Sequence, residues 1–288
     1  GCSTVAAVVN GYALYDQKGY MEKTNTYLFA WRKTPLNDVI ADYSRAARFT
    51  LYLYDQFGID ILKYITQTSK YGMDVYLEAL SRVDYNISFG SLLENWFIAN
   101  NLDDKTINPA WGYELYPDLP KAYGLSFYNP NAKIESAVEN YAVEYITFKA
   151  GENLKVWFSS GSKAIKIKAI KIGNSKKEVV DIPLNSVVSI PEFGSDCSII
   201  TFAVMNPTNN SQQSYICIST GDNKAIELKW DVNESNGYLK SSPLDTLCVA
   251  FDSINGGSLD SIKIAAGKKG VLTGAVYKFT GVIRPTPL

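Results

Sequence analysis

Apolar side chains recur at helical spacing through the first third of the chain, most clearly in residues 37–57. Apolar residues there return at steps of three and four, which predicts a helix with one buried face. Asn37 or Asp38 can cap its start, and Gly58 stands where a helix favours a left-handed C-terminal residue. The recurring positions are Ile40, Tyr43, Ala47, Leu51 and Tyr54.

A preceding helix is expected between Ser3 or Thr4, either of which can cap it, and Gly19, where it would stop. Its apolar face consists of Val5, Val8, Val9 and Tyr12.

Three more helices follow. Asp60 and Asp74 are expected to cap short helices over residues 61–69 and 75–83. The last helix has Ser88 as its cap and ends on two adjacent aspartates. Five helices therefore predict an all-α unit over residues 1–121. The buried face of the last helix should consist of Phe89, Leu92, Leu93, Trp96 and Ala99.

Residues 105–141 contain four prolines and many tyrosines, which predicts an ordered, irregular connection packed on its neighbours. From there on the apolar period is two, which predicts half-buried strands. Turn signals about every 8 to 12 residues favour an antiparallel β-sandwich region over 122–288, as one module or as two divided near Gly221 and Asp222. The alternating positions are Leu154, Val156 and Phe158; Ile200, Phe202 and Val204; Ile226, Leu228 and Trp230; and Leu247, Val249 and Phe251.

The fold class predicted from these patterns is α+β, with a helical part followed by a sandwich. In AIKIKAIKI, residues 164–172, the apolar positions change from odd to even numbers, which predicts a β-bulge near Ala169.

Composition narrows the functions. An apolar share of 46% is ample for a core in each part, and a net charge of −1 provides no electrostatic footprint for nucleic acid. No run approaches the roughly 20 apolar residues of a membrane span, and no signal peptide opens the chain.

Four cysteines, Cys2, Cys197, Cys217 and Cys248, lack the paired spacing of a metal site, and the chain has no histidine to complete one. We therefore expect no zinc site within this chain alone. Cys197 and Cys217 flank an expected hairpin with its turn near Asn209, in which Cys217 would face a residue near 203. The cysteines are accordingly expected to be buried free thiols.

The absence of histidine also excludes the Ser-His-Asp and Cys-His arrangements of nucleophilic catalysis, and neither a GxxxxGK[ST] nor a GxGxxG loop is present. Carboxylates remain as candidates for an acid–base pair or a calcium site, although solvated helix faces and ends are the commoner role of such residues. These candidates are Asp42, Glu78, Glu94, Asp103 and Asp104.

Three aromatic features are further candidates. Tyr43 can donate a hydrogen bond from its helix, but a core position is the commoner role. Trp157 and the segment WGYELYP, residues 111–117, can stack on sugar rings, against which we weigh packing of that segment on the helices.

Four stretches of the helical part resemble a known family. GCSTVAAVVNGY (1–12), DYSRAARFTLYLYDQFG (42–58), SFGSLLENWFIANNLDD (88–104) and WGYELYPDLP (111–120) are similar to the region after the zinc-binding motif in secreted bacterial gluzincin-type zinc metallopeptidases of the hyicolysin-like and immune-inhibitor-like group. The most specific likeness is a W-x-x-A-N-x-L-D-D pattern, formed here by Trp96, Ala99, Asn100, Leu102, Asp103 and Asp104.

In that family a HExxH helix supplies two zinc ligands and the general base, and a later glutamate is the third ligand. Gly1, Ser3 and Ala6 match residues that follow this glutamate. The resemblance thus implies a helical subdomain forming one wall of a peptidase cleft, β-sandwich modules after it, and an extracellular or cell-surface location.

HExxH and the glutamate ligand are both missing here, so no residue receives a catalytic, cofactor-binding or metal-binding role. The resemblance leaves two possibilities, a chain separated from its catalytic half or a non-catalytic relative. Its partners would be that half or a protein or glycan ligand. The hypothesis from another class is a secreted or surface binding module that recognises a glycan or a protein through the sandwich.

Overall fold

The computed structural model describes residues 1–12, 18–116, 119–173, 176–222, 226–231 and 269–274. Helices come first and strands second, which confirms the α+β fold class. The helices are α1 (Cys2–Val9), α2 (Lys18–Met21), α3 (Leu36–Phe57), α4 (Ile59–Gln67), α5 (Met73–Arg82) and α6 (Phe89–Leu102).

The first helix is shorter than predicted. α1 ends at Val9 because the Asn10 side chain donates to Ala6 O at 2.7 Å and Gly11 takes a left-handed φ of +85°. Val5 is buried in the core, whereas Val9 and Tyr12 are exposed. The expected stop at Gly19 instead lies inside α2, a short helix that the sequence analysis did not predict.

α3 begins one residue before the predicted start, and Gly58, with φ of +74°, ends it as expected. Neither Asn37 nor Asp38 caps it, because Pro35 occupies the N-cap position.

α4 and α5 each begin two residues earlier than predicted, since Gly58 and Gly72, both with positive φ, are the residues that precede them. Asp60 and Asp74 lie in the first turns without making a cap hydrogen bond. Their negative charge is nonetheless favourable at a helix N-terminus.

α6 agrees with its prediction. The Ser88 hydroxyl accepts a hydrogen bond from the Ser91 N–H at 3.1 Å, and all five apolar residues expected on the buried face are buried. The helix ends at Asp103 in the left-handed conformation, with φ of +49°.

The strands form three sheets in the described residues. The five-stranded sheet has the order β1-β3-β8-β5-β6, the four-stranded sheet β2-β9-β4-β7, and β10 pairs with β11. Pairing is antiparallel except between β1 and β3. The strands are β1 (Leu125–Phe127), β2 (Ala132–Val138), β3 (Ala142–Phe148), β4 (Glu152–Ser159), β5 (Lys166–Gly173), β6 (Lys177–Asp181), β7 (Val187–Ile190), β8 (Cys197–Asn206), β9 (Gln213–Asp222), β10 (Ile226–Asp231) and β11 (Lys269–Gly274).

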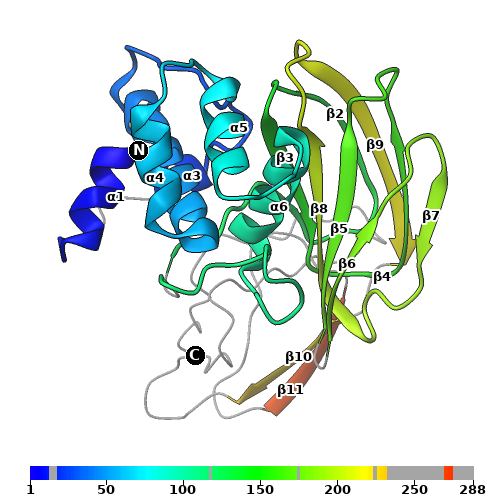
Figure 1. Cartoon of the computed structure of the whole chain (residues 1–288). Coiled ribbons are helices and arrows are strands. Elements are labelled where there is room, and N and C mark those ends of the chain that lie inside the picture. The colour runs from blue at the N-terminus through cyan, green and yellow to red at the C-terminus, as the bar shows by residue number, and fades with distance from the viewer. Residues whose placement is uncertain (13–17, 117–118, 174–175, 223–225, 232–268, 275–288) are drawn as a thin grey trace.

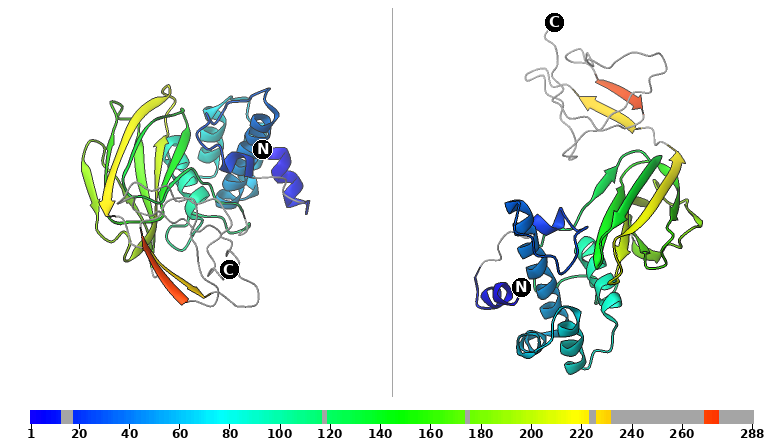
Figure 2. Two further views of the ribbon diagram at one scale, coloured as in Figure 1. Left: turned by 180° about the vertical axis from the view of Figure 1, so that it is seen from behind. Right: turned by 90° about the horizontal axis from the view of Figure 1, so that it is seen from above.

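Helices, five-stranded sheet and four-stranded sheet form three successive layers, with α6 against the five-stranded sheet (Figures 1 and 2). One core fills the space between the helices and the five-stranded sheet, and a second fills the sandwich between the two sheets. The Tyr145 hydroxyl on β3 donates to Phe97 O on α6 at 2.6 Å, which links the first two layers through a buried bond.

This layering corrects the predicted bulge near Ala169. β5 pairs continuously with β8 from Lys166 to Ile172, and the register shift comes later, at Gly173. The apolar positions change parity because both faces of β5 are covered: Ile167 and Ala169 face the sandwich, and Ile170 faces the helices. A strand that is buried on both sides loses the simple alternation from which the bulge was inferred.

The predicted hairpin between the two later cysteines is also wrong. β8 and β9 belong to different sheets, so Cys217 pairs with Ile134 and Phe158 instead of a residue near 203. Cys197 and Cys217 are both buried and both free, as expected, and Cys2 is free and half-buried.

Two strands of the sandwich begin inside the stretch predicted to be irregular, since β1 and β2 lie before residue 141. The alternating residues of β4 are buried as predicted, whereas β8 is buried on both faces. The alternating residues of 226–230 fall in β10, while Leu247, Cys248, Val249 and Phe251 lie outside the described residues. The possible division near Gly221 stays a prediction.

Candidate functional site

Asp42, a predicted catalytic candidate, lies at the centre of a buried ion-pair network on α3. Its carboxylate is fully buried and accepts hydrogen bonds from Arg32 N at 2.7 Å, Arg32 Nη2 at 2.6 Å and Arg45 Nη1 at 2.6 Å. Burial raises the pKa of Asp42, but the hydrogen bonds from the two arginines outweigh it, so that the net pKa is lowered. Asp42 is therefore a structural anion that stays charged at neutral pH.

An exposed apolar surface lies on the same part of α3. Leu36, Ile40 and Tyr43 follow one another at helical spacing and are exposed by 71%, 38% and 58%. Trp31, exposed by 54%, packs edge-on against Tyr43 with 4.7 Å between the ring centroids. We call these four residues the exposed α3 face. Tyr43 is thus not a core residue, contrary to the commoner of its two predicted roles.

Further along α3, a second buried group joins three of the stretches quoted above. Arg48 Nε donates to Asn100 Oδ1 on α6 and to the Tyr113 hydroxyl, both at 3.1 Å, and that hydroxyl donates to Asn100 Oδ1 at 2.6 Å. The guanidinium lies over the Tyr113 ring, 4.4 Å from its centroid. We call Arg48, Asn100 and Tyr113 the buried arginine cluster; Arg48 and Asn100 are wholly buried and Tyr113 nearly so.

The two aspartates after α6 turn the chain. Asp103 Oδ1 accepts from Tyr113 N at 2.9 Å, and Asp104 Oδ2 accepts from Lys177 Nζ on β6 at 2.6 Å. The hydrogen bond from Lys177, followed by that from Thr106, lowers the pKa of Asp104. Asp55 of α3 holds the same segment through Glu114 N at 2.9 Å. These carboxylates fix the backbone of residues 104–115.

Glu78 and Glu94 lie apart from these residues. The Thr68 hydroxyl donates to Glu78 at 2.6 Å and, together with Arg82, lowers the pKa of that carboxyl group. Burial raises the pKa of Glu94. Within the described residues no three acidic or thiol side chains are grouped so that they can hold a metal ion. The structure therefore does not gather the predicted carboxylates into one site.

Trp111 and Tyr113 of the aromatic segment pack on the helices, which is the predicted alternative to sugar stacking. Trp111 Nε1 donates to Asn95 Oδ1 at 3.0 Å, and Tyr113 is buried beneath Arg48.

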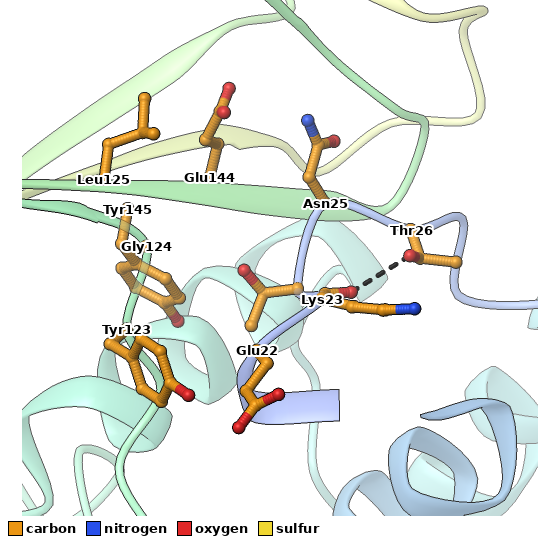
Figure 3. Close-up of a pocket in the computed structure, with 10 residues that line it drawn as sticks. Glu22, Lys23, Asn25, Thr26, Tyr123, Gly124, Leu125, Glu144 and Tyr145 are labelled. Carbon is orange, nitrogen blue, oxygen red and sulfur yellow. Dashed lines mark hydrogen bonds between the residues drawn. The ribbon is translucent and has the colours of Figure 1, made fainter. Parts of the chain in front are cut away.

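A surface hollow of about 420 Å³ lies where the helical part meets the sandwich (Figure 3). Glu22, Tyr123 and Glu144 belong to its lining. In Figure 3 the Glu22 and Glu144 side chains point in opposite directions, so they form no acid–base pair. Asn25 fixes the bordering loop by donating to Ala137 O at 2.8 Å and accepting from Glu139 N at 2.9 Å.

The outer surface of the four-stranded sheet carries a row of neighbouring residues. Strand register aligns Val187, Trp157, Ile218 and Lys133 across β7, β4, β9 and β2. Val187 and Ile218 are exposed and Trp157 is partly exposed. We call this row the outer-sheet row. A hollow of about 620 Å³ adjoins it, with Ser136, Ser159, Ser160 and Ser214 among its lining residues.

The buried arginine cluster was not predicted. Its one local signal is that Arg48 lies three residues before Leu51, next to the predicted apolar face of the helix, and the structure buries both fully. A buried charged residue needs polar partners, since lone buried charges are strongly unfavourable.

No protein-family model and no curated protein matches the chain. Among solved structures it is similar to PliG of Salmonella Typhimurium, a periplasmic inhibitor of g-type lysozyme, with 14% identity over 34% of this chain and 96% of that chain and a TM-score of 0.26. A PliG mutant from Escherichia coli gives 16% identity over 34% and 98%, with a TM-score of 0.25. The family GH115 glucuronidase BtGH115A gives 11% identity over 72% and 33%, with a TM-score of 0.18. Likenesses this low carry no argument about function.

None of the helices in the described ranges has the length and apolar character needed to cross a bilayer.

Proposed function

We propose that this chain is the non-catalytic part of a secreted bacterial zinc metallopeptidase-type protein, with its helical part serving as one wall of the substrate cleft. The observation that carries the proposal is the buried arginine cluster. It joins one side chain from each of three stretches that resemble the peptidase family: Arg48, Asn100 and Tyr113. Stretches that are similar one by one thus form a single packed unit.

A cleft wall also needs a surface for substrate or for the zinc-binding half. The exposed α3 face provides an apolar surface of the kind that marks interaction sites. α1 is seated beside it: a Cβ placed on Gly1 would come within 2.6 Å of Ala46 O on α3. In the resembled family, residues matching Gly1 follow the third zinc ligand, so the stretch that bears this ligand would lie next to α3.

Peptide hydrolysis in this proposal depends on residues outside the chain, because 1–288 contains no histidine. Zinc-bound water would be the nucleophile in the complete protein. The exposed α3 face would bind apolar side chains of the substrate or pack against the catalytic half, outside the cell.

The test compares casein cleavage by the longer gene product and by residues 1–288, with and without a chelator. Chelator-sensitive cleavage by the longer product alone is expected. Within that product, Trp31→Ala should lower kcat/KM several-fold. Tyr71→Ala, which removes a more exposed aromatic residue outside the exposed α3 face, should not. Absence of cleavage by either protein refutes the proposal.

A second candidate is a binding module for neutral glycans, which the outer-sheet row favours. Trp157 lies between two aliphatic residues and next to a hollow rich in serine hydroxyls. An aromatic ring beside hydroxyl donors and acceptors suits a sugar. Lys133 and Glu135 form an ion pair at 2.6 Å on the same surface, so their charges offset each other.

This candidate is tested by measuring binding of residues 1–288 to a panel of neutral polysaccharides by affinity electrophoresis. Trp157→Ala should abolish retardation and Trp31→Ala should leave it unchanged. Equal retardation of both variants, or none with the unmodified chain, counts against it.

A further inference from the structure

The buried arginine cluster contains more hydrogen-bond donors than acceptors. Arg48 and Asn100 are both 0% exposed. Among the described residues, Arg48 Nη1, Arg48 Nη2 and Asn100 Nδ2 have no hydrogen-bond partner. Buried donors in folded proteins are almost always bonded, so three unbonded ones in one contact require an explanation.

Turning the Asn100 amide does not resolve the excess. Oδ1 already accepts from Arg48 Nε at 3.1 Å and from the Tyr113 hydroxyl at 2.6 Å. Exchanging oxygen and nitrogen would place the amide NH₂ against the guanidinium N–H, donor against donor. The hydrogen-bond network therefore fixes the orientation of this amide.

The charge of Arg48 is also uncompensated. No carboxylate of the described residues lies within ion-pair distance of it, whereas the equally buried Arg45 lies 2.6 Å from Asp42. The Tyr113 ring, 4.4 Å away, interacts with one face of the guanidinium and leaves its edge, where the N–H groups point, without a negative partner.

The surroundings limit the size of any partner. Trp96 lies between Tyr20 and Phe49, at centroid distances of 5.4 Å and 4.8 Å, and Tyr52 packs on Tyr113 at 5.9 Å. All these rings are buried and the Arg48 Nη atoms themselves are inaccessible to solvent, so a partner bound there must be small.

We propose that the Nη atoms of Arg48 and the Nδ2 atom of Asn100 bind a small monovalent inorganic anion of the chloride class inside the helical core. A single negative charge offsets the guanidinium, and a spherical ion accepts from several N–H groups without itself needing donors. The ion is a structural ligand of the core, and the proposal is independent of the peptidase and glycan proposals.

The first experiment measures thermal unfolding of the 288-residue chain while sodium chloride replaces sodium gluconate at constant ionic strength. Gluconate is too large for the site, so general screening stays the same in every sample. The melting temperature should rise with chloride and then saturate, because a ligand that binds only the folded state stabilises it by mass action.

Two variants locate the effect. Asn100→Asp keeps an oxygen for Arg48 Nε and Tyr113 and places a negative charge beside the guanidinium, so it should remove the chloride dependence. Arg82→Met, which removes an exposed arginine of α5, should keep the full dependence. Arg48→Met should also remove the chloride dependence. If Arg48→Met does not fold, the result for Asn100→Asp decides.

The second experiment collects anomalous diffraction from crystals grown with sodium bromide. The expected result is a peak in contact with Arg48 Nη and Asn100 Nδ2. A water molecule at that place, a carboxylate there from another part of the chain, or a melting temperature that does not respond to chloride overturns the proposal.

Discussion

Replacing Asp42 by Asn tests whether the network on α3 holds the helical part together. The substitution keeps the side-chain volume, so it leaves no cavity, but it removes the only carboxylate that pairs with Arg45 among the described residues. Arg45 stays 1% exposed, and its other hydrogen bonds go to the carbonyl groups of Leu28 and Ala30. The variant therefore contains a buried cation without a counter-ion.

The expected loss in the free energy of unfolding is about 3–5 kcal/mol, the usual cost of removing one partner from a buried ion pair. We assign it mainly to Arg45, because the Arg32 side chain is 27% exposed and can be solvated after the substitution. With about 2–4 °C per kcal/mol for a domain of this size, the melting temperature should fall by roughly 6–20 °C.

The loss should depend on pH. The folded-state pKa of Asp42 is lowered, so its contribution to stability is complete above the unfolded pKa of about 3.9 and is lost as the pH falls through the folded value. The difference between the parent and Asp42→Asn should therefore be constant at neutral pH and shrink below pH 4, to about zero once Asp42 is protonated in both states.

Circular dichroism at 222 nm during thermal and urea unfolding measures both effects. Asp60→Asn is the matched control, because Asp60 forms an exposed pair with Lys63 on α4 and its replacement should leave the melting temperature nearly unchanged. The reasoning is refuted if the two variants unfold together, or if the Asp42→Asn loss is the same at pH 3 and pH 7.

Three further substitutions or measurements probe the remainder of the fold. Gly124→Ala should destabilise the chain by about 1–3 kcal/mol in urea unfolding, because the new Cβ would lie 2.2 Å from Tyr145 O. Gly161→Ala, whose Cβ meets nothing within 4 Å, is the control and should be neutral. Equal effects of the two substitutions would contradict the packing around Gly124. Ser88→Ala should cost about 1 kcal/mol through the lost cap of α6, and an unchanged midpoint would show that the cap is unimportant. Burial raises the pKa of the Cys217 thiol to about 12, so at pH 8 mass spectrometry should find iodoacetamide on Cys217 after denaturation only; rapid labelling of the folded chain would disprove this burial.

Sequence patterns predicted the helix ends best where the end is caused by an interaction within one helical turn. Ser88 and Gly58 mark the ends of α6 and α3 because a side-chain cap and a left-handed residue act within one helical turn. α1 ends at Val9, two residues before the left-handed Gly11, for the same local reason, whereas Gly19 lies inside α2.

Predictions failed where the structure depends on distant contacts. Ile170 is buried by helices more than 60 residues away in sequence, so its change of parity in β5 was mistaken for a bulge. Cys197 and Cys217 were assigned to one hairpin because sequence spacing alone does not separate a hairpin from a crossing between sheets. The buried arginine cluster is formed by three segments that are distant in sequence, and no single segment indicates which residues it will contact.

The five-stranded sheet, covered on both faces, also constrains how the described part of the chain can come apart. Tyr145 and Met205 belong to the core under the helices, while their strand neighbours Ile146 and Val204 belong to the sandwich. Pulling the helices away would uncover one side of the same strands that close the sandwich. Helical and sandwich parts should accordingly melt in a single cooperative transition, and a protease cutting in residues 103–124 should leave two fragments that stay associated until both unfold.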